Sequence, residues 1–331
     1  MTVRNMMIGA VATATAVALT ACGGGQDTPA AEDGGRIKVV ASTNVWGSVV
    51  EAVGGDAVEV TSIIDDPSGD PHSYESRPAD VAAVRDARLV IFNGGGYDDF
   101  FATLLGPETE GAKKIEAFPI SGKASGHEEP GHEEPSHEEP GHEEAGAAEP
   151  TEDGHGHDHA VNEHVWYDFE TVHLVAEQAA ADLGEIAPHR KAEFETNARD
   201  FGAKLDELTS ALDGKGAGKR VLQTEPVAHY LLDAAGVEDA TPESFSDAVE
   251  EETDVPAAAL AEVLDLVTGK QVSALVNNAQ TENAATGQVV EAARSGGVPV
   301  VEVTETLPEG ATGYLDWMTK QVDALVGALG A

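Results

Sequence analysis

The chain has 331 residues, which is enough for two domains. Hydrophobic residues make up 41% of it and can build a sizeable core. The formal net charge of −41 argues against a nucleic-acid partner, because phosphate backbones are bound by Lys and Arg, and it favours a cation as the ligand.

The N-terminal segment predicts export and lipid anchoring. Residues 1–21 carry one positive residue, Arg4, and then an apolar run that is short for a membrane span and typical of a secretory signal peptide. The run ends in Leu-Thr-Ala-Cys22, which resembles the bacterial lipobox, whose cysteine becomes the lipidated first residue of the mature protein. The alternative is an incidental cysteine in an ordinary signal peptide. We expect residues 22–35 to be a tether that holds the protein at the outer face of the membrane.

Cys22 is the single cysteine of the chain, so we expect neither a disulfide framework nor a cysteine-ligated zinc site. Short strand and helix patterns alternate in the region that follows the tether. Strands are predicted at residues 36–42, 58–64, 88–93 and 114–118, and helices at residues 45–53 and 78–86. This alternation predicts a parallel α/β sheet, in which ligands bind at the carboxyl ends of the strands. His72 lies in a turn-rich loop after the second strand and so occupies that kind of position.

A tract dense in His and Glu follows. Four near-copies of a His-Glu-Glu-Pro-Gly pentapeptide begin at His127, and eight of the twelve histidines lie between His127 and His164. The Pro, Gly and Glu content predicts a disordered loop at residues 125–160. Imidazole beside carboxylate is a ligand set of zinc and related ions, so we expect accessory metal contacts there, with a plain solvated linker as the alternative. The accessory ligands would be His127, His132, His137, His142, His155, His157 and His159.

Such a tract must order itself around each ion, which weakens its affinity, so a rigid main site is expected elsewhere. A helix is predicted from Asp168, its N-cap, to Ile186, and a second helix at residues 188–212 has one apolar face. The second helix would span roughly 37 Å at 1.5 Å per residue and reads as a stiff connector.

The rest of the chain repeats the pattern of the first part. Strands are predicted at residues 220–224, 272–277 and 298–303, and helices at residues 227–235, 256–269, 283–295 and 314–329. The expected fold class is therefore α/β, with two lobes that are each a small parallel sheet flanked by helices. The N-terminal lobe would cover residues 36–187, the linking helix residues 188–212 and the C-terminal lobe residues 213–331.

We find no convincing catalytic motif in the sequence. Residues 214–220 mimic a phosphate loop, but the segment ends in Arg where Ser or Thr should hold magnesium, and it precedes a strand. Four other residues follow predicted strands or lie in loops that would face a cleft between the lobes: His72, His164, Glu225 and Glu305. Two imidazoles and two carboxylates would hold a divalent ion, although His164 as a helix cap and Glu225 as a turn residue are simpler alternatives.

These four residues lie in motifs. Residues 69–75, Gly-Asp-Pro-His-Ser-Tyr-Glu, resemble the Asp-Pro-His-x-Tyr-Glu motif of the solute-binding lipoproteins of zinc and manganese ABC importers. Residues 163–168, Glu-His-Val-Trp-Tyr-Asp, resemble their Pro-His-x-Trp-x-Asp motif, and a His-rich acidic loop before it marks the zinc-type members. Residues 222–230 and 303–307 resemble the segments that give the third and fourth ligands.

The resemblance runs from about residue 37 to the C-terminus. It implies two α/β lobes joined by a long rigid helix, with a metal ion in the cleft bound by His72, His164, Glu225 and Glu305. It also implies a protein that is no enzyme and that delivers the ion to a membrane permease with its ATPase subunit. We expect this protein to act as a lipid-anchored monomer.

The chain departs from the family pattern at several positions. Glu225 stands where zinc-type members often have His and manganese-type members have Glu, and His229 is a candidate replacement ligand. Glu305 stands for the usual Asp, and Asn162-Glu163 stands for Asp-Pro. We expect Zn²⁺ as the transported ion, because imidazoles and the Irving–Williams order favour it, with Mn²⁺ as the alternative. A metal-dependent hydrolase and an adhesin of the same fold are more distant alternatives.

Overall fold

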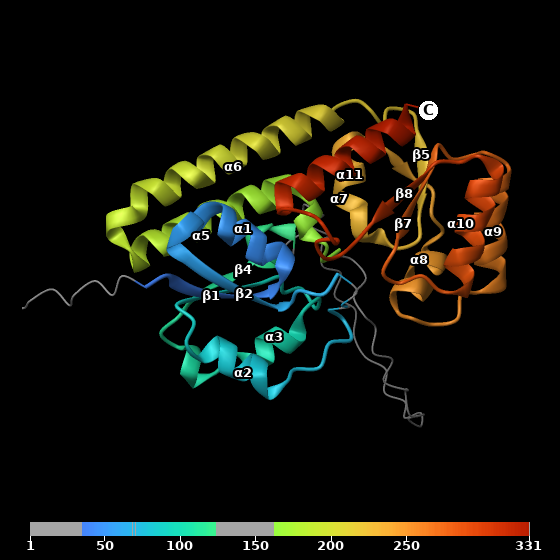
Figure 1. Ribbon diagram of the computed structural model, residues 1–331. Helices are drawn as coiled ribbons and strands as arrows, with labels where there is room; N and C mark the ends of the chain where they lie inside the picture. Colours follow the sequence, from blue (N-terminus) through green and yellow to red (C-terminus); the bar gives the residue numbers. More distant parts are fainter. Residues whose placement is uncertain (1–34, 68, 70, 124–161, 331) are drawn as a thin grey trace, which may run out of the picture. The chain divides into compact units, whose positions relative to one another are not determined.

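The computed structural model describes residues 35–67, 69, 71–123 and 162–330, coloured from blue at the N-terminal side to red in Figure 1. The chain from Arg36 onward forms one compact unit. The predicted signal peptide, Cys22 and the His-rich loop 125–160 lie outside the described residues. Within the described ranges, no helix is both long enough and apolar enough to cross a membrane.

The first sheet has four parallel strands in the order β2-β1-β3-β4. The strands are β1 (Ile37–Thr43), β2 (Val58–Ile64), β3 (Leu89–Phe92) and β4 (Lys113–Glu116). The central strands β1 and β3 are buried almost throughout, which is why the sequence shows them as continuous apolar runs.

Helices cover both faces of this sheet because successive side chains of a strand point to opposite sides. Val39 and Leu89 pack in one core with α1 and α5, whereas Val40 and Val90 pack in another with α2 and α3. The first face carries α1 (Asn44–Gly54) and α5 (Phe169–Ile186), and the second carries α2 (Pro78–Arg85) and α3 (Asp99–Leu104) (Figure 1).

The second sheet repeats this plan with the strand order β6-β5-β7-β8. Its parallel strands are β5 (Arg220–Gln223), β6 (Glu238–Asp239), β7 (Ala274–Asn278) and β8 (Val300–Val303). Leu222 and Leu275 pack in a core with α8 (Glu243–Glu250), α9 (Ala257–Thr268) and α10 (Ala284–Gly296). On the other face, Val221 and Val276 share a core with α7 (His229–Ala235) and α11 (Tyr314–Leu329).

One long helix joins the two lobes. The predicted helix 188–212 is a 3-10 turn (Pro188–Arg190) followed by α6 (Lys191–Leu212), whose 22 residues span roughly 33 Å at 1.5 Å per residue. α6 packs along α5 and α1, and α11 returns from the second lobe to pack against both α6 and α1. Tyr314, at the start of α11, donates its hydroxyl to the carbonyl of Trp166 at 2.6 Å. A single apolar core therefore continues across both lobes.

The predicted fold class is confirmed: two parallel α/β lobes connected by a long helix. The sequence did not predict α3, α4 (Ala117–Ile120), α8 or the edge strand β6. The predicted strand 114–118 was wrong at its end, because Phe118 already lies in α4. The lobe boundaries at residues 36–187 and 213–331 stay predictions.

Candidate metal centre

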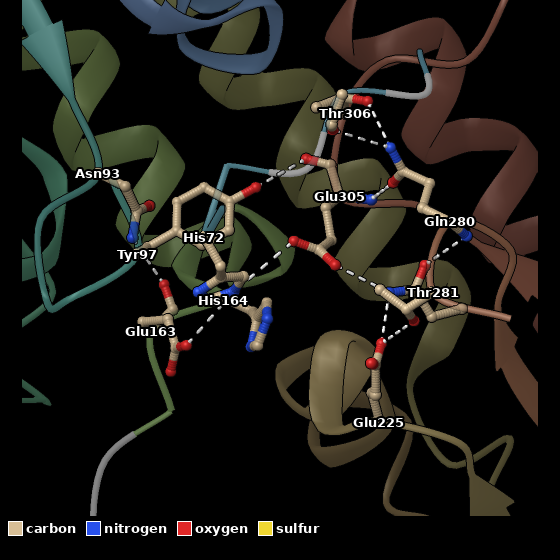
Figure 2. Close-up of polar contacts among 12 residues, drawn as sticks. His72, Asn93, Tyr97, Glu163, His164, Glu225, Gln280, Thr281, Glu305 and Thr306 are labelled. Atoms are coloured by element: carbon tan, nitrogen blue, oxygen red, sulfur yellow. Dashed lines mark hydrogen bonds and ion pairs between the residues drawn. The ribbon is translucent and has the colours of Figure 1, made fainter. Parts of the chain in front are cut away.

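The four predicted ligands lie around one cavity. His72 follows β2, Glu225 follows β5 and Glu305 follows β8, each beyond the carboxyl end of its strand, and His164 leads into the helical turn before α5. All four line a cavity of about 210 Å³. Figure 2 shows the two imidazoles approaching from the first lobe, while both carboxylates extend from the second.

His72 and Glu305 approach closely enough to share one ion. His72 Nε2 lies 3.8 Å from Glu305 Oε2, and the rings of His72 and His164 are 6.3 Å apart between centroids. Two atoms bound about 2.1 Å from one ion lie at most about 4.2 Å apart. His164, Glu225 and Glu305 are buried, whereas the His72 side chain is 37% exposed. His72 therefore forms the solvent-facing side of the cavity.

The His164 imidazole is oriented by its neighbours. Its Nδ1 lies 3.0 Å from Asn162 Oδ1, which also accepts a hydrogen bond from the His164 backbone at 2.9 Å. An amide oxygen can only accept, so Nδ1 carries the proton and Nε2 keeps the lone pair that a metal needs. Burial against Tyr97 and Trp166 lowers the pKa of His164 to about 4, so protons compete with a metal there only in acid.

The two carboxylates share one amide. Asn278 Nδ2 donates to Glu225 Oε2 and to Glu305 Oε1, the second bond being 2.8 Å long. The Thr281 hydroxyl donates to Glu225 Oε2 at 2.6 Å. Buried carboxylates need hydrogen-bond donors to compensate for lost water, and Asn278 and Thr281 supply them here.

Hydrogen bonds tie the lobes together beside the cavity. Gln280 Nε2 donates to Pro67 O at 2.8 Å and to Thr306 Oγ1 at 2.9 Å, which links the loop after β2 to the loop after β8. On the other side, Asn162 Nδ2 donates to Pro226 O at 2.7 Å. The residue that orients His164 thus also contacts the segment that follows Glu225.

Further acidic residues surround the cavity. Its lining includes Glu250, Glu251 and Glu252, at the end of α8. Burial, and then the charges of Glu163 and Glu225, raise the pKa of Glu250 to about 8. Glu163 stands beside the imidazoles, and the ligand atoms of His72, Glu163 and His164 all lie within 4.8 Å of one another.

The other histidines are placed differently. His229, the candidate replacement ligand, lies on α7 with Nε2 3.3 Å from Asp233, and it is not among the residues that line the cavity. His173 lies on α5 near Glu177, as a helix-surface residue. The seven accessory histidines between His127 and His159 lie outside the described residues, and so does Cys22.

Sequence reasoning did not assign roles to several residues of this site. Asn278 is the last residue of β7, and Gln280 and Thr281 follow it; in the second sheet β7 lies between β5 and β8, the strands that precede Glu225 and Glu305. Polar residues directly after a buried strand were the available signal. Glu163 was visible only as a departure from the Asp-Pro of the resembling motif.

Two α/β lobes with an imidazole and carboxylate cavity between them define a metal-binding solute-binding protein. Over residues 39–328, the sequence matches the family described as "Zinc-uptake complex component A periplasmic", and the chain belongs to this family. It is thus the substrate-binding component of a metal-importing ABC transporter and not an enzyme.

Individual relatives resemble this chain only at low sequence identity. The manganese-binding lipoprotein MntA of Halalkalibacterium halodurans is 26% identical over 333 residues, which cover 95% of each chain. The manganese ABC transporter substrate-binding lipoprotein PsaA of Streptococcus pneumoniae is 26% identical and covers 73% of this chain and 77% of its own. The structure of the periplasmic zinc-binding protein TroA of Treponema pallidum has a TM-score of 0.64 at 16% identity, over 89% of this chain and 99% of TroA. This last likeness concerns the fold alone.

Proposed function

We propose that the protein captures Zn²⁺ outside the cytoplasm and delivers it to a membrane permease that works with an ATPase subunit. His72 and His164 from the first lobe, with Glu225 and Glu305 from the second, would hold the ion. The observation that carries the proposal is the convergence of two imidazoles and two buried carboxylates on one small cavity at the ends of the strands. Nitrogen and oxygen donors in this number are a zinc ligand set.

Mn²⁺ is the second candidate ion. The two carboxylates are hard ligands that suit manganese, and both MntA and PsaA are named for manganese. The family description and the two imidazoles favour zinc, and the Irving–Williams order places zinc above manganese at such a site. Zinc is therefore the first choice.

Two segments outside the described residues have supporting roles in this proposal. Cys22 would carry the lipid that anchors a monomeric protein to the outer face of the membrane. The histidines of residues 125–160 would raise the local concentration of metal. The described chain resumes at Asn162, whose side chain bonds His164.

Competitive calorimetry on two forms that both start after Cys22 tests this function. One form is intact, and the other lacks residues 125–160; each is titrated with zinc and with manganese. We expect one tight zinc site in both forms and additional weak sites only in the intact form. If the shortened form prefers manganese, or loses all tight zinc binding, the zinc assignment is wrong.

A further inference from the structure

Glu163 places a third carboxylate next to the imidazoles. Its Oε1 lies 3.9 Å from His72 Nε2, which is close to the 3.8 Å between His72 Nε2 and Glu305 Oε2. Both separations are below the limit of about 4.2 Å for two atoms that bind one ion at about 2.1 Å. Figure 2 shows the Glu163 side chain beside both imidazoles, on the side of His72 away from Gln280 and Thr306.

The position of Glu163 is fixed by the backbone around it. Its carbonyl oxygen accepts a hydrogen bond from Asn93 Nδ2 at 2.9 Å and another from the Val165 backbone at 2.7 Å. The side chain is only 16% exposed, and within the described part of the chain its ion-pair partner is His72. A carboxylate with so little access to water needs a positive partner, and a divalent ion on the adjacent imidazoles would supply one.

We propose that Glu163 is a fifth ligand of the transported ion and fits the site to Mn²⁺ as well as Zn²⁺. The inference rests on the proposed function, because it takes His72, His164, Glu225 and Glu305 as the other ligands. Zinc is satisfied by four ligands, whereas manganese prefers more ligands and a larger share of oxygen. The third carboxylate therefore contributes more to manganese affinity than to zinc affinity.

Three variants of the full chain separate ligation from simple charge. Glu163→Gln removes the charge at constant shape, and Glu163→Asp keeps the charge but withdraws it by one methylene. Glu252→Gln is the matched control, because Glu252 lines the same cavity and loses the same charge. The His-rich tract is present in every variant and so contributes equally to each titration.

Chelator-competition titrations with Zn²⁺ and with Mn²⁺ measure the effect. We expect both Glu163 variants to lower manganese affinity by about tenfold or more and zinc affinity by less than about threefold. Glu252→Gln removes a charge from the same cavity without removing a ligand, so it should lower both affinities by the same small factor. X-ray absorption at the manganese edge, with one equivalent of metal, should show one oxygen ligand fewer in the Glu163 variants.

Two results would overturn the inference alone. One is a Glu163→Gln chain that binds both metals as Glu252→Gln does, while the parent chain binds them tightly. The other is full manganese affinity in Glu163→Asp, because a charge acting from a distance would then suffice. A parent chain that binds neither metal tightly would instead contradict the proposed function.

Discussion

The two halves of the candidate metal centre are built in different ways. In the first lobe, imidazoles pack against aromatic rings: Tyr97 lies 5.0 Å from His72 and Trp166 lies 5.1 Å from His164, between ring centroids. In the second lobe, two buried carboxylates are held by the amide of Asn278. A neutral imidazole tolerates an apolar surrounding, whereas a carboxylate keeps its charge there only through hydrogen bonds.

This difference separates the roles of packing and hydrogen bonding. Burial against aromatic rings keeps His164 neutral and ready for a metal, and Asn162 selects which of its ring nitrogens is free. Without Asn278, the carboxylates of Glu225 and Glu305 would repel each other, because both are withdrawn from water. Loss of a ligand should therefore have the largest effect, followed by loss of the shared amide and then of the amide that orients His164.

The largest effect is expected from His164→Ala. This variant loses one of the two imidazoles, and zinc affinity should fall by more than about 100-fold, since loss of a partner behind a ligand already costs 10–100-fold. His173→Ala is the matched control, because His173 lies on the surface of α5. Equal zinc affinity of the two variants in a competition titration would place the ion elsewhere.

Asn278→Ala leaves the two carboxylates without their shared donor. We expect zinc affinity to fall by about 10–100-fold and the free energy of unfolding by about 1–3 kcal/mol. Asn277→Ala provides the comparison, because the buried Asn277 side chain donates to Glu302 Oε2 at 2.7 Å and not to Glu225 or Glu305. That variant should lose stability in a denaturant titration and keep its zinc affinity. Zinc affinity that falls equally in both variants would contradict a role at the ligands.

Asn162→Ala removes the acceptor for His164 Nδ1. The imidazole then has no fixed tautomer, and zinc affinity should fall by about tenfold. Asn162→Asp keeps an acceptor at this place, so we expect it to retain the affinity although it loses the donor to Pro226. If the Asp variant binds as weakly as the Ala variant, Asn162 acts through its contact with the second lobe.

The smallest expected effect is on the pH dependence of the free energy of unfolding. The pKa of Glu250 is about 8 in the folded protein against an ordinary value of 4.5, because burial and nearby carboxylates disfavour its charge. The folded state thus holds a proton that the unfolded state has lost between these values, so the free energy of unfolding falls as pH rises through this window.

Glu250→Gln should remove the decrease in the free energy of unfolding that Glu250 causes as pH rises. Measured on metal-free protein, the variant should gain about 1–3 kcal/mol over the parent chain between pH 5 and pH 9, since partial exposure reduces the full effect of the shift. Parallel stability curves for the two proteins would show that Glu250 ionises normally in the folded state.

The sequence predicted the framework of the site but not its hydrogen bonds. Short motifs and strand patterns singled out His72, His164, Glu225 and Glu305, which line one cavity because residues after parallel strands gather at one edge of a sheet. Asn278 contacts Glu225 across 53 positions of sequence, and no local pattern predicts which polar side chain will lie between two carboxylates.

The other features that the sequence did not predict were also missed for physical reasons. α8 was not predicted because it is only eight residues long and five of them are polar, so the sequence lacks a long apolar stripe. Glu250, its last residue, was missed for the same reason. Glu163 was visible beside His164, but its orientation depends on the backbone bonds with Asn93 and Val165. The Asn93 bond exists only once the loops after β3 and before α5 have come together.

The most direct test of the central claim is zinc-edge X-ray absorption on the chain loaded with one equivalent of zinc. We expect two imidazoles together with carboxylate oxygens around the ion, and one imidazole fewer in His164→Ala. A spectrum with more than two imidazoles that is unchanged in His164→Ala would place the ion on the His-rich tract and contradict a metal centre between the lobes.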